Sequence, residues 1–240
     1  MNRLPRPARL LTFAVLVMLS VGALCAAPKP ARAEDIVSVL QRSDATRLAT
    51  MMPALSLREA AVRVLSDDFE RLLDRVGPST SPMPELRIVG AGTVAETLHG
   101  RVVVVNVALA EWPREARSFV MAHELYHVRA RHWSERLALY QRFIPGEVRQ
   151  IDTDAVAAEL GRAASRQSHA HEQAADAFAL NLLLDIGYDE EQLMTMFRRI
   201  GNHPATPTHP SLGQRLAHLR QIVARRALAS RAAGDVANEV

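Results

Sequence analysis

The stretch that decides the fold is His123-Glu124-Leu125-Tyr126-His127, near the middle of a chain of 240 residues. On a helix, residues four apart share one face with about 5–6 Å between their Cβ atoms, so both imidazoles can reach one metal ion. Glu124 projects about 100° further round the helix, where it can hold a water molecule at the metal's open position. The alternative is an amphipathic helix that packs two histidines against the core.

A catalytic zinc site needs a third protein ligand and leaves the fourth position to water. Further along the chain, Glu172 and Asp176 stand four residues apart in an Ala- and Leu-rich helical run that ends near Ile186-Gly187. They share one helix face, so one of the two carboxylates can bind zinc. The other can accept the N–H of a liganding histidine and fix its tautomer. The alternative is a solvated acidic face, which fits a helix of this composition poorly.

Three separated motifs follow one another along the chain: residues 123–132, residues 172–176, and Thr208-His209-Pro210 with Arg215. In their order and residue types they resemble the HtpX-type zinc metallopeptidases, which are gluzincins of peptidase family M48. That family also contains the CAAX prenyl endopeptidases and several bacterial periplasmic proteases of protein quality control. The resemblance extends from about Val102 to Leu219.

The resemblance implies a role for each matching residue. The implied zinc ligands are His123, His127 and Glu172. It further implies that Glu124 is the general base and that Asp176 and Arg215 support the ligands. The chain departs from the family in having Tyr126 where a glycine is usual, and in lacking a longer Gly-rich hairpin before the motif helix.

The other histidines differ in what their positions indicate. His209 lies in a loop after the Glu172 helix, and groups that stabilise an oxyanion commonly come from such a separate segment. We therefore expect His209 at the open zinc position, either as an oxyanion donor or as a cap on the zinc. His132 is expected to be structural or exposed. His171 adjoins Glu172 but is turned about 100° away on an ideal helix, so we do not expect it to be a ligand.

The N-terminus has the layout of a secretory signal peptide. Arg3, Arg6 and Arg9 precede an apolar stretch over residues 10–27, and Ala31-Arg32-Ala33 is a small-x-small cleavage site. The sequence thus predicts a signal peptide over residues 1–33, a zinc metallopeptidase domain over residues 34–240, and a periplasmic location. The alternative is an uncleaved anchor in the inner membrane, facing the periplasm.

Charge and cysteine content argue against nucleic-acid binding, lipid attachment and a disulfide. Residues 1–33 hold five of the 29 basic residues and none of the 26 acidic ones, so the remainder has a net charge of −2. No basic cluster of the kind that binds nucleic acid survives removal of this leader. The single cysteine, Cys25, follows Leu24 rather than the small residue of a lipid-attachment signal, so neither a lipoprotein nor a disulfide is expected.

Hydrophobic periodicity predicts an α+β fold that is mainly helical, with a small β-sheet beside the motif helix. Two strands are expected, Leu86-Arg87-Ile88-Val89 and residues 101–107, with a Gly-rich loop between them. Residues 34–53 form a short helix or a loosely packed arm. Further helices are expected over residues 56–75, opened by a Ser56/Glu59 capping box, after Trp112-Pro113, over 153–166, around Glu172, and over 190–200 and 211–231. Residues 137–143 extend or follow the motif helix.

Together these features predict an endopeptidase with one Zn²⁺ per chain that cleaves unfolded or misassembled cell-envelope proteins. We expect an extended substrate to add a strand to the edge of the small sheet. Partners at the membrane surface or in outer-membrane assembly fit this setting. Two alternatives remain: a chaperone-like binding module with secondary proteolysis, and a structural domain whose zinc is closed by a fourth ligand such as His209.

Overall fold

A small mixed sheet lies beside the motif helix in the computed structural model, which describes residues 34–51, 59–77, 83–90, 92–199 and 204–238. The strand order is β1-β3-β2, with β1 (Glu85–Val89) parallel and β2 (Ala95–Leu98) antiparallel to β3 (Val102–Asn106). The expected α+β, mainly helical class is confirmed. The expectation of only two strands was wrong, because the loop between them contains β2. This strand is short and not rich in β-branched residues, so its pairing with β3 defines it rather than its own propensity.

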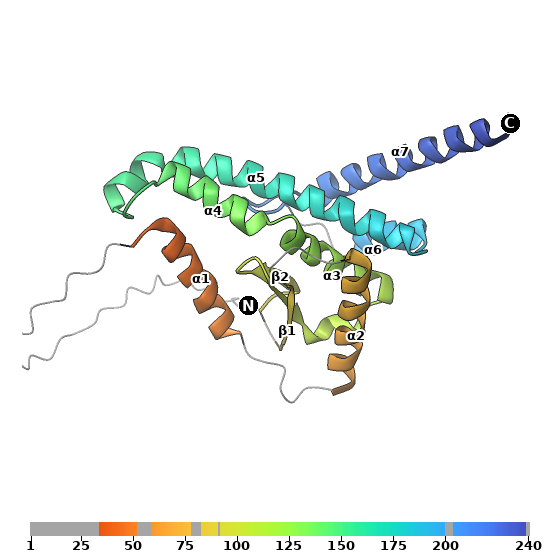
Figure 1. The fold of residues 1–240 in the computed structure, drawn as a ribbon, viewed down its shortest axis with the longest axis horizontal. Coiled ribbons are helices and arrows are strands. Elements are labelled where there is room, and N and C mark those ends of the chain that lie inside the picture. Colours follow the sequence, from red (N-terminus) through yellow and green to blue (C-terminus); the bar gives the residue numbers. More distant parts are fainter. Residues whose placement is uncertain (1–33, 52–58, 78–82, 91, 200–203, 239–240) are drawn as a thin grey trace, which may run out of the picture. The chain divides into compact units, whose positions relative to one another are not determined.

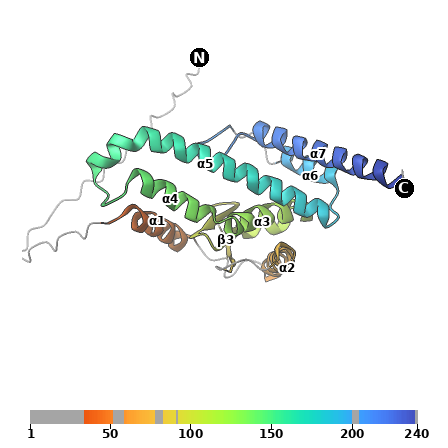
Figure 2. The same ribbon diagram turned by 45° about the horizontal axis from the view of Figure 1, so that its top comes forward.

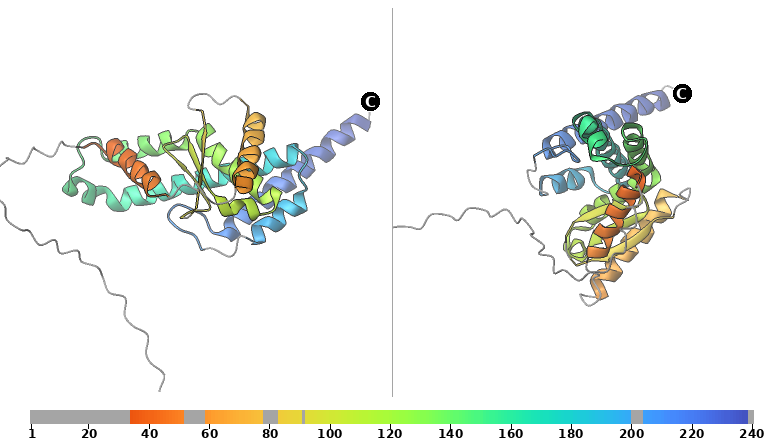
Figure 3. Two further views of the ribbon diagram at one scale, coloured as in Figure 1. Left: turned by 90° about the horizontal axis from the view of Figure 1, so that it is seen from below. Right: turned by 90° about the vertical axis from the view of Figure 1, so that its left-hand side faces the viewer.

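The central strand β3 is buried because both faces of the sheet are covered. Val103 and Val105 face the main core, to which α2 and the motif helix contribute. Val102 and Val104 face the opposite way and pack near Leu48 of α1. Figure 3 shows α1 and α2 on either side of the sheet. This double coverage explains an uninterrupted run of valines in place of apolar and polar alternation.

Helices make up most of the described chain. Their bounds are α1 Ile36–Thr50, α2 Glu59–Val76, the 3₁₀ helix η1 Val107–Glu111, α3 Arg114–Arg129, α4 His132–Phe143, α5 Gln150–Asp185, α6 Glu190–Arg199 and α7 Leu212–Asn238. The segment after residue 34 is thus a helix, and the Asp35 carboxylate caps it by accepting from the Ser38 amide at 2.7 Å. Ser56, half of the expected capping box, lies outside the described residues.

The longest helix, α5, was expected as two. Its 36 residues continue through the polar segment around Ser168, where separate helices had been predicted to end and begin. In Figure 1, α5 lies above α4 and α3, and it contacts both of these helices. Figure 2 shows α6 and α7 beside its C-terminal half, and α5 also contacts α7. Packing along most of its length therefore maintains the helix where local propensity is weak.

The motif helix α3 and the next helix, α4, are separate elements. Ala130 closes α3, and Arg131 then adopts a left-handed conformation with a φ of 56° before α4 starts at His132. Residues 137–143 therefore follow the motif helix within α4 and do not extend α3.

No helix among the described residues is long and apolar enough to cross a membrane. The expected signal peptide, residues 1–33, lies outside them.

Candidate active site

Two helices bring three possible metal ligands together. His123 and His127 come from α3 and Glu172 from α5, and their donor atoms all lie within 4.8 Å of one another. The two Nε2 atoms are 3.1 Å apart, and the Glu172 carboxylate oxygens lie 3.5 Å from His123 Nε2 and 3.4 Å from His127 Nε2. Tetrahedral zinc with Zn–N bonds of 2.0–2.1 Å separates its ligands by about 3.3 Å. The donor set and its spacing therefore fit zinc.

Asp176 fixes the orientation of the first histidine. Its carboxylate is fully buried and accepts from His123 Nδ1 at 3.0 Å. Arg215 of α7 donates two hydrogen bonds to the same carboxylate, of 2.6 and 2.7 Å. Burial opposes ionisation of Asp176, but the hydrogen bonds from Arg215 and His123 outweigh it and lower its pKa. With Nδ1–H donated to Asp176, His123 directs its Nε2 lone pair toward the other two donors.

The charges of the ligand group are coupled. Burial alone would lower the pKa of His123. The hydrogen bonds to Asp176 and Glu172 outweigh this effect and raise the pKa to about 10. Burial likewise opposes ionisation of Glu172, while hydrogen bonds with His123 and His127 lower its pKa overall. Glu172 is therefore a carboxylate, as a metal ligand must be, and a metal ion would take the place of the His123 proton.

Glu124 is nearly buried beside this group and is held by the sheet. Thr97 of β2 lies with its Oγ1 2.8 Å from Glu124 Oε2 and 3.1 Å from the Glu124 carbonyl oxygen. Sequence reasoning missed Thr97 because it missed β2. The only available signal was a hydroxyl residue in a short segment just before a predicted strand, and that pattern is common.

The second histidine has a neighbour that was not expected. His132 is buried, and its Nδ1 lies 2.8 Å from His127 Nδ1. Burial together with the neighbouring His127 lowers the pKa of His132 to about 3, so its ring is neutral. Of the two alternatives expected for His132, structural or exposed, its burial leaves the structural one. His171 is not one of the three clustered donors, and its Nε2 lies 2.7 Å from Glu135 Oε2.

The loop before α7 carries His209 to the edge of the site. Its Nε2 lies 3.6 Å from Glu172 Oε2, and its side chain is 57% exposed. Its Nδ1 is 2.9 Å from the Thr208 hydroxyl, and Thr206 and His209 are joined by further bonds within the loop. The structure thus places His209 next to a ligand and open to solvent.

A cavity of about 610 Å³ opens at this site. Side chains from α1, β2, α3, α4, α5 and the His209 loop border it, among them Glu96 and Thr97 of β2, Glu124 and His127 of α3, Glu172 of α5, and His209. Arg47 of α1 also borders it and is held by two hydrogen bonds to Glu96, at 2.5 and 2.8 Å. A second cavity of about 550 Å³, between the start of α3 and α6, contains none of these residues.

The profile described as Peptidase family M48 matches residues 94–223, more than half of the chain. The chain belongs to peptidase family M48. The match begins just before β2 and ends within α7, so it includes the three possible metal ligands and Glu124 but leaves out α1, which contributes Arg47 to the cavity, and α2. Members of this family are metallopeptidases, typically zinc-dependent, and the chain is accordingly a metallopeptidase with a group of residues able to hold a metal ion. No curated protein matches the chain.

Proposed function

We propose that this M48 peptidase is a zinc-dependent endopeptidase that hydrolyses unfolded or misassembled cell-envelope proteins in protein quality control. The observation that carries the proposal is the spacing of three donors, one each from His123, His127 and Glu172, at separations that match tetrahedral zinc. Three protein ligands leave one position open, which is the arrangement of a catalytic rather than a closed structural site.

The proposed chemistry uses Glu124 as general base. When bound, zinc supplies Lewis acidity to the scissile carbonyl and to the attacking water. Glu124 takes a proton from that water and passes it to the leaving amine. Thr97 holds the carboxylate in place through its hydroxyl, and Asp176 keeps His123 in the tautomer that a metal ligand needs. His209 donates a hydrogen bond to the developing oxyanion from the mouth of the cavity.

The proposed substrate is an extended polypeptide. β2 is a terminal strand of the sheet, and its residues 95–98 border the cavity that contains Glu124 and Glu172. A peptide that adds a strand to such an edge binds mainly through its backbone, with pockets for alternate side chains. Unfolded and misassembled proteins offer free backbone of this kind, whereas folded proteins do not. This reasoning supports a quality-control role.

The proposed setting is the periplasm, entered through a signal peptide at residues 1–33. The support is the basic start, apolar stretch and Ala31-Arg32-Ala33 site of the sequence. An anchor in the inner membrane facing the periplasm is the alternative. The likeness to HtpX-type and bacterial periplasmic members of the family supports partners at the membrane surface or in outer-membrane assembly.

Zinc content and hydrolysis of an unfolded casein-like protein, measured together on the purified mature chain, test the proposal. We expect about one zinc per chain and cleavage that stops with a chelator and returns with added Zn²⁺. A chaperone-like module would prevent aggregation of the substrate equally well when Glu124 is replaced by glutamine. A closed structural zinc site would retain its metal and cleave nothing.

A further inference from the structure

The break between α3 and α4 places a third histidine ring against the ligand group. On an uninterrupted helix, a residue five positions after His127 would be turned about 140° away from it. The left-handed conformation of Arg131, with a φ of 56°, instead turns the chain back. As a result, the Nδ1 atoms of His127 and His132 are 2.8 Å apart. A non-glycine residue with positive φ is uncommon and draws attention to what it positions.

The chemistry of two imidazoles determines which of them donates. Of two nitrogens at this distance, one must carry a hydrogen and the other must offer a lone pair. His127 directs its Nε2 toward His123 and Glu172, at 3.1 and 3.4 Å. A metal ligand at Nε2 leaves the hydrogen of a neutral imidazole on Nδ1. His127 Nδ1–H is therefore the donor, and His132 Nδ1 is the acceptor.

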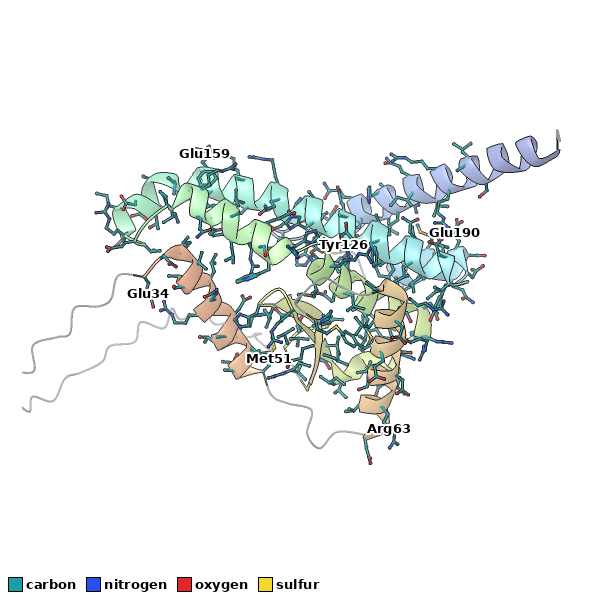
Figure 4. The ribbon with its side chains drawn as sticks, in the orientation of Figure 1. Glu34, Met51, Arg63, Tyr126, Glu159 and Glu190 are labelled. Atoms are coloured by element: carbon teal, nitrogen blue, oxygen red, sulfur yellow. The ribbon has the colours of Figure 1, made fainter. Side chains whose placement is uncertain are left out.

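Surrounding rings hold the acceptor in place. The His132 ring lies flat against His171, with centroids 3.8 Å apart and planes within 2°. Tyr126 meets it edge-on at 5.5 Å and itself stacks on Phe178 at 4.7 Å. Figure 4 labels Tyr126 where α3 meets α5. The residue that departs from the usual glycine of the family thus forms one wall around His132.

We propose that His132 is a positioning residue that accepts the Nδ1–H hydrogen bond of His127. It thereby fixes the orientation of the His127 ring in which Nε2 faces the metal site. It does for His127 what Asp176 does for His123, but with a neutral acceptor in place of a carboxylate. Losing such a contact typically lowers metal affinity about 10–100-fold. The inference rests on the metal site of the proposed function.

Two nearly isosteric variants separate hydrogen bonding from packing. His132→Asn can offer an acceptor oxygen near the position of Nδ1, whereas His132→Leu cannot. We expect His132→Leu to bind Zn²⁺ about 10–100-fold more weakly, measured by competition with a chromophoric chelator, and to change the visible spectrum of the Co²⁺ form. His132→Asn should recover most of the affinity. His171→Leu is the matched control, since it alters the stacked ring without touching His127, and should stay within about threefold.

Equal affinities for His132→Asn and His132→Leu, or an equal loss in His171→Leu, would overturn the inference and leave a packing role. Nitrogen-15 NMR of the Zn²⁺-loaded wild type, labelled at histidine, needs no variant. It therefore tests the proposal even if the His132→Leu chain does not fold. We expect hydrogen on Nδ1 of His127 and on Nε2 of His132; hydrogen on Nδ1 of His132 contradicts the proposal. A wild type that binds no Zn²⁺ would instead refute the proposed function.

Discussion

Thr97 on β2 donates a hydrogen bond to the carboxylate of Glu124 on α3, with 2.8 Å between Thr97 Oγ1 and Glu124 Oε2. This bond joins the terminal strand of the sheet to the motif helix. The strand that would pair with an extended substrate therefore also holds the proposed general base. In the proposed mechanism, Thr97 would therefore link the bound substrate to the proton acceptor Glu124.

Replacing Glu124 by glutamine should abolish hydrolysis and leave zinc bound. Glutamine has nearly the same shape as glutamate but cannot accept the proton of the attacking water. Glu124 is not one of the three donors that lie together, so the metal site should remain intact. Turnover and zinc content measured on the same preparation check this. Near wild-type turnover would contradict the proposed mechanism.

Replacing Thr97 by valine should lower kcat about 10–100-fold without changing zinc affinity. A hydrogen bond to a charged group contributes about 1.5–3 kcal/mol, and about 1.4 kcal/mol corresponds to a factor of ten in rate. Valine keeps the branched shape and loses only the hydroxyl. Thr97→Ser is the control, because it retains the donor and should remain within about threefold of wild type. Equal rates in the valine and serine variants would show that the bond does not matter for catalysis.

Glu172 and Asp176 of α5 should behave differently when replaced. Glu172→Ala should release zinc, because it removes one of three ligands. Asp176→Asn should weaken zinc binding about 10–100-fold, since it alters only the partner of His123 Nδ1. Metal analysis after dialysis distinguishes the two outcomes. Full zinc occupancy in Glu172→Ala would require a different third ligand.

Replacing Arg215 by methionine should destabilise the fold. Asp176 is fully buried, and Arg215 gives it two short hydrogen bonds. Breaking a buried ion pair by removing one partner typically lowers the free energy of unfolding by about 3–5 kcal/mol. The control is Arg63→Met, which removes the exposed Arg63–Glu59 pair on α2 and should change it by less than about 1 kcal/mol. Urea unfolding in the presence of a chelator measures both, and equal effects would contradict the prediction.

The parts of the site that could be predicted from the sequence are those that local helix geometry determines. Their spacing of four residues predicted that His123 and His127 share one helix face. The same spacing predicted this for Glu172 and Asp176. The structure brings the donors of both helices together. The class of the fold followed in the same way from periodicity.

The parts that could not be predicted depend on contacts between distant segments. β2 is defined by its pairing with β3, so Thr97 and its bond to Glu124 could not be anticipated. Arg131 gives no sign in the sequence that it adopts positive φ, because that conformation is usual only for glycine. The contact of His132 with His127 follows from this single backbone conformation and was missed with it.

His209 is the residue whose two expected roles predict opposite results. A cap would have to complete the coordination of zinc, but among the described residues the donors within 4.8 Å of one another are those of His123, His127 and Glu172. His209 lies outside this group, although its Nε2 is 3.6 Å from one Glu172 oxygen, and its side chain is 57% exposed. That position favours a donor to the oxyanion over a zinc ligand.

Replacing His209 by alanine should therefore lower kcat about 10²–10³-fold on a short unstructured peptide, as the loss of an oxyanion donor typically does. Zinc affinity should stay unchanged, because the three ligands remain. A capping role predicts the reverse: activity should rise, because an autoinhibited population is removed. Thr208→Val is a graded control, since the Thr208 hydroxyl lies 2.9 Å from His209 Nδ1 and only orients the ring. Its effect should be smaller than that of His209→Ala, and His209→Ala activity within twofold of wild type would assign His209 neither role.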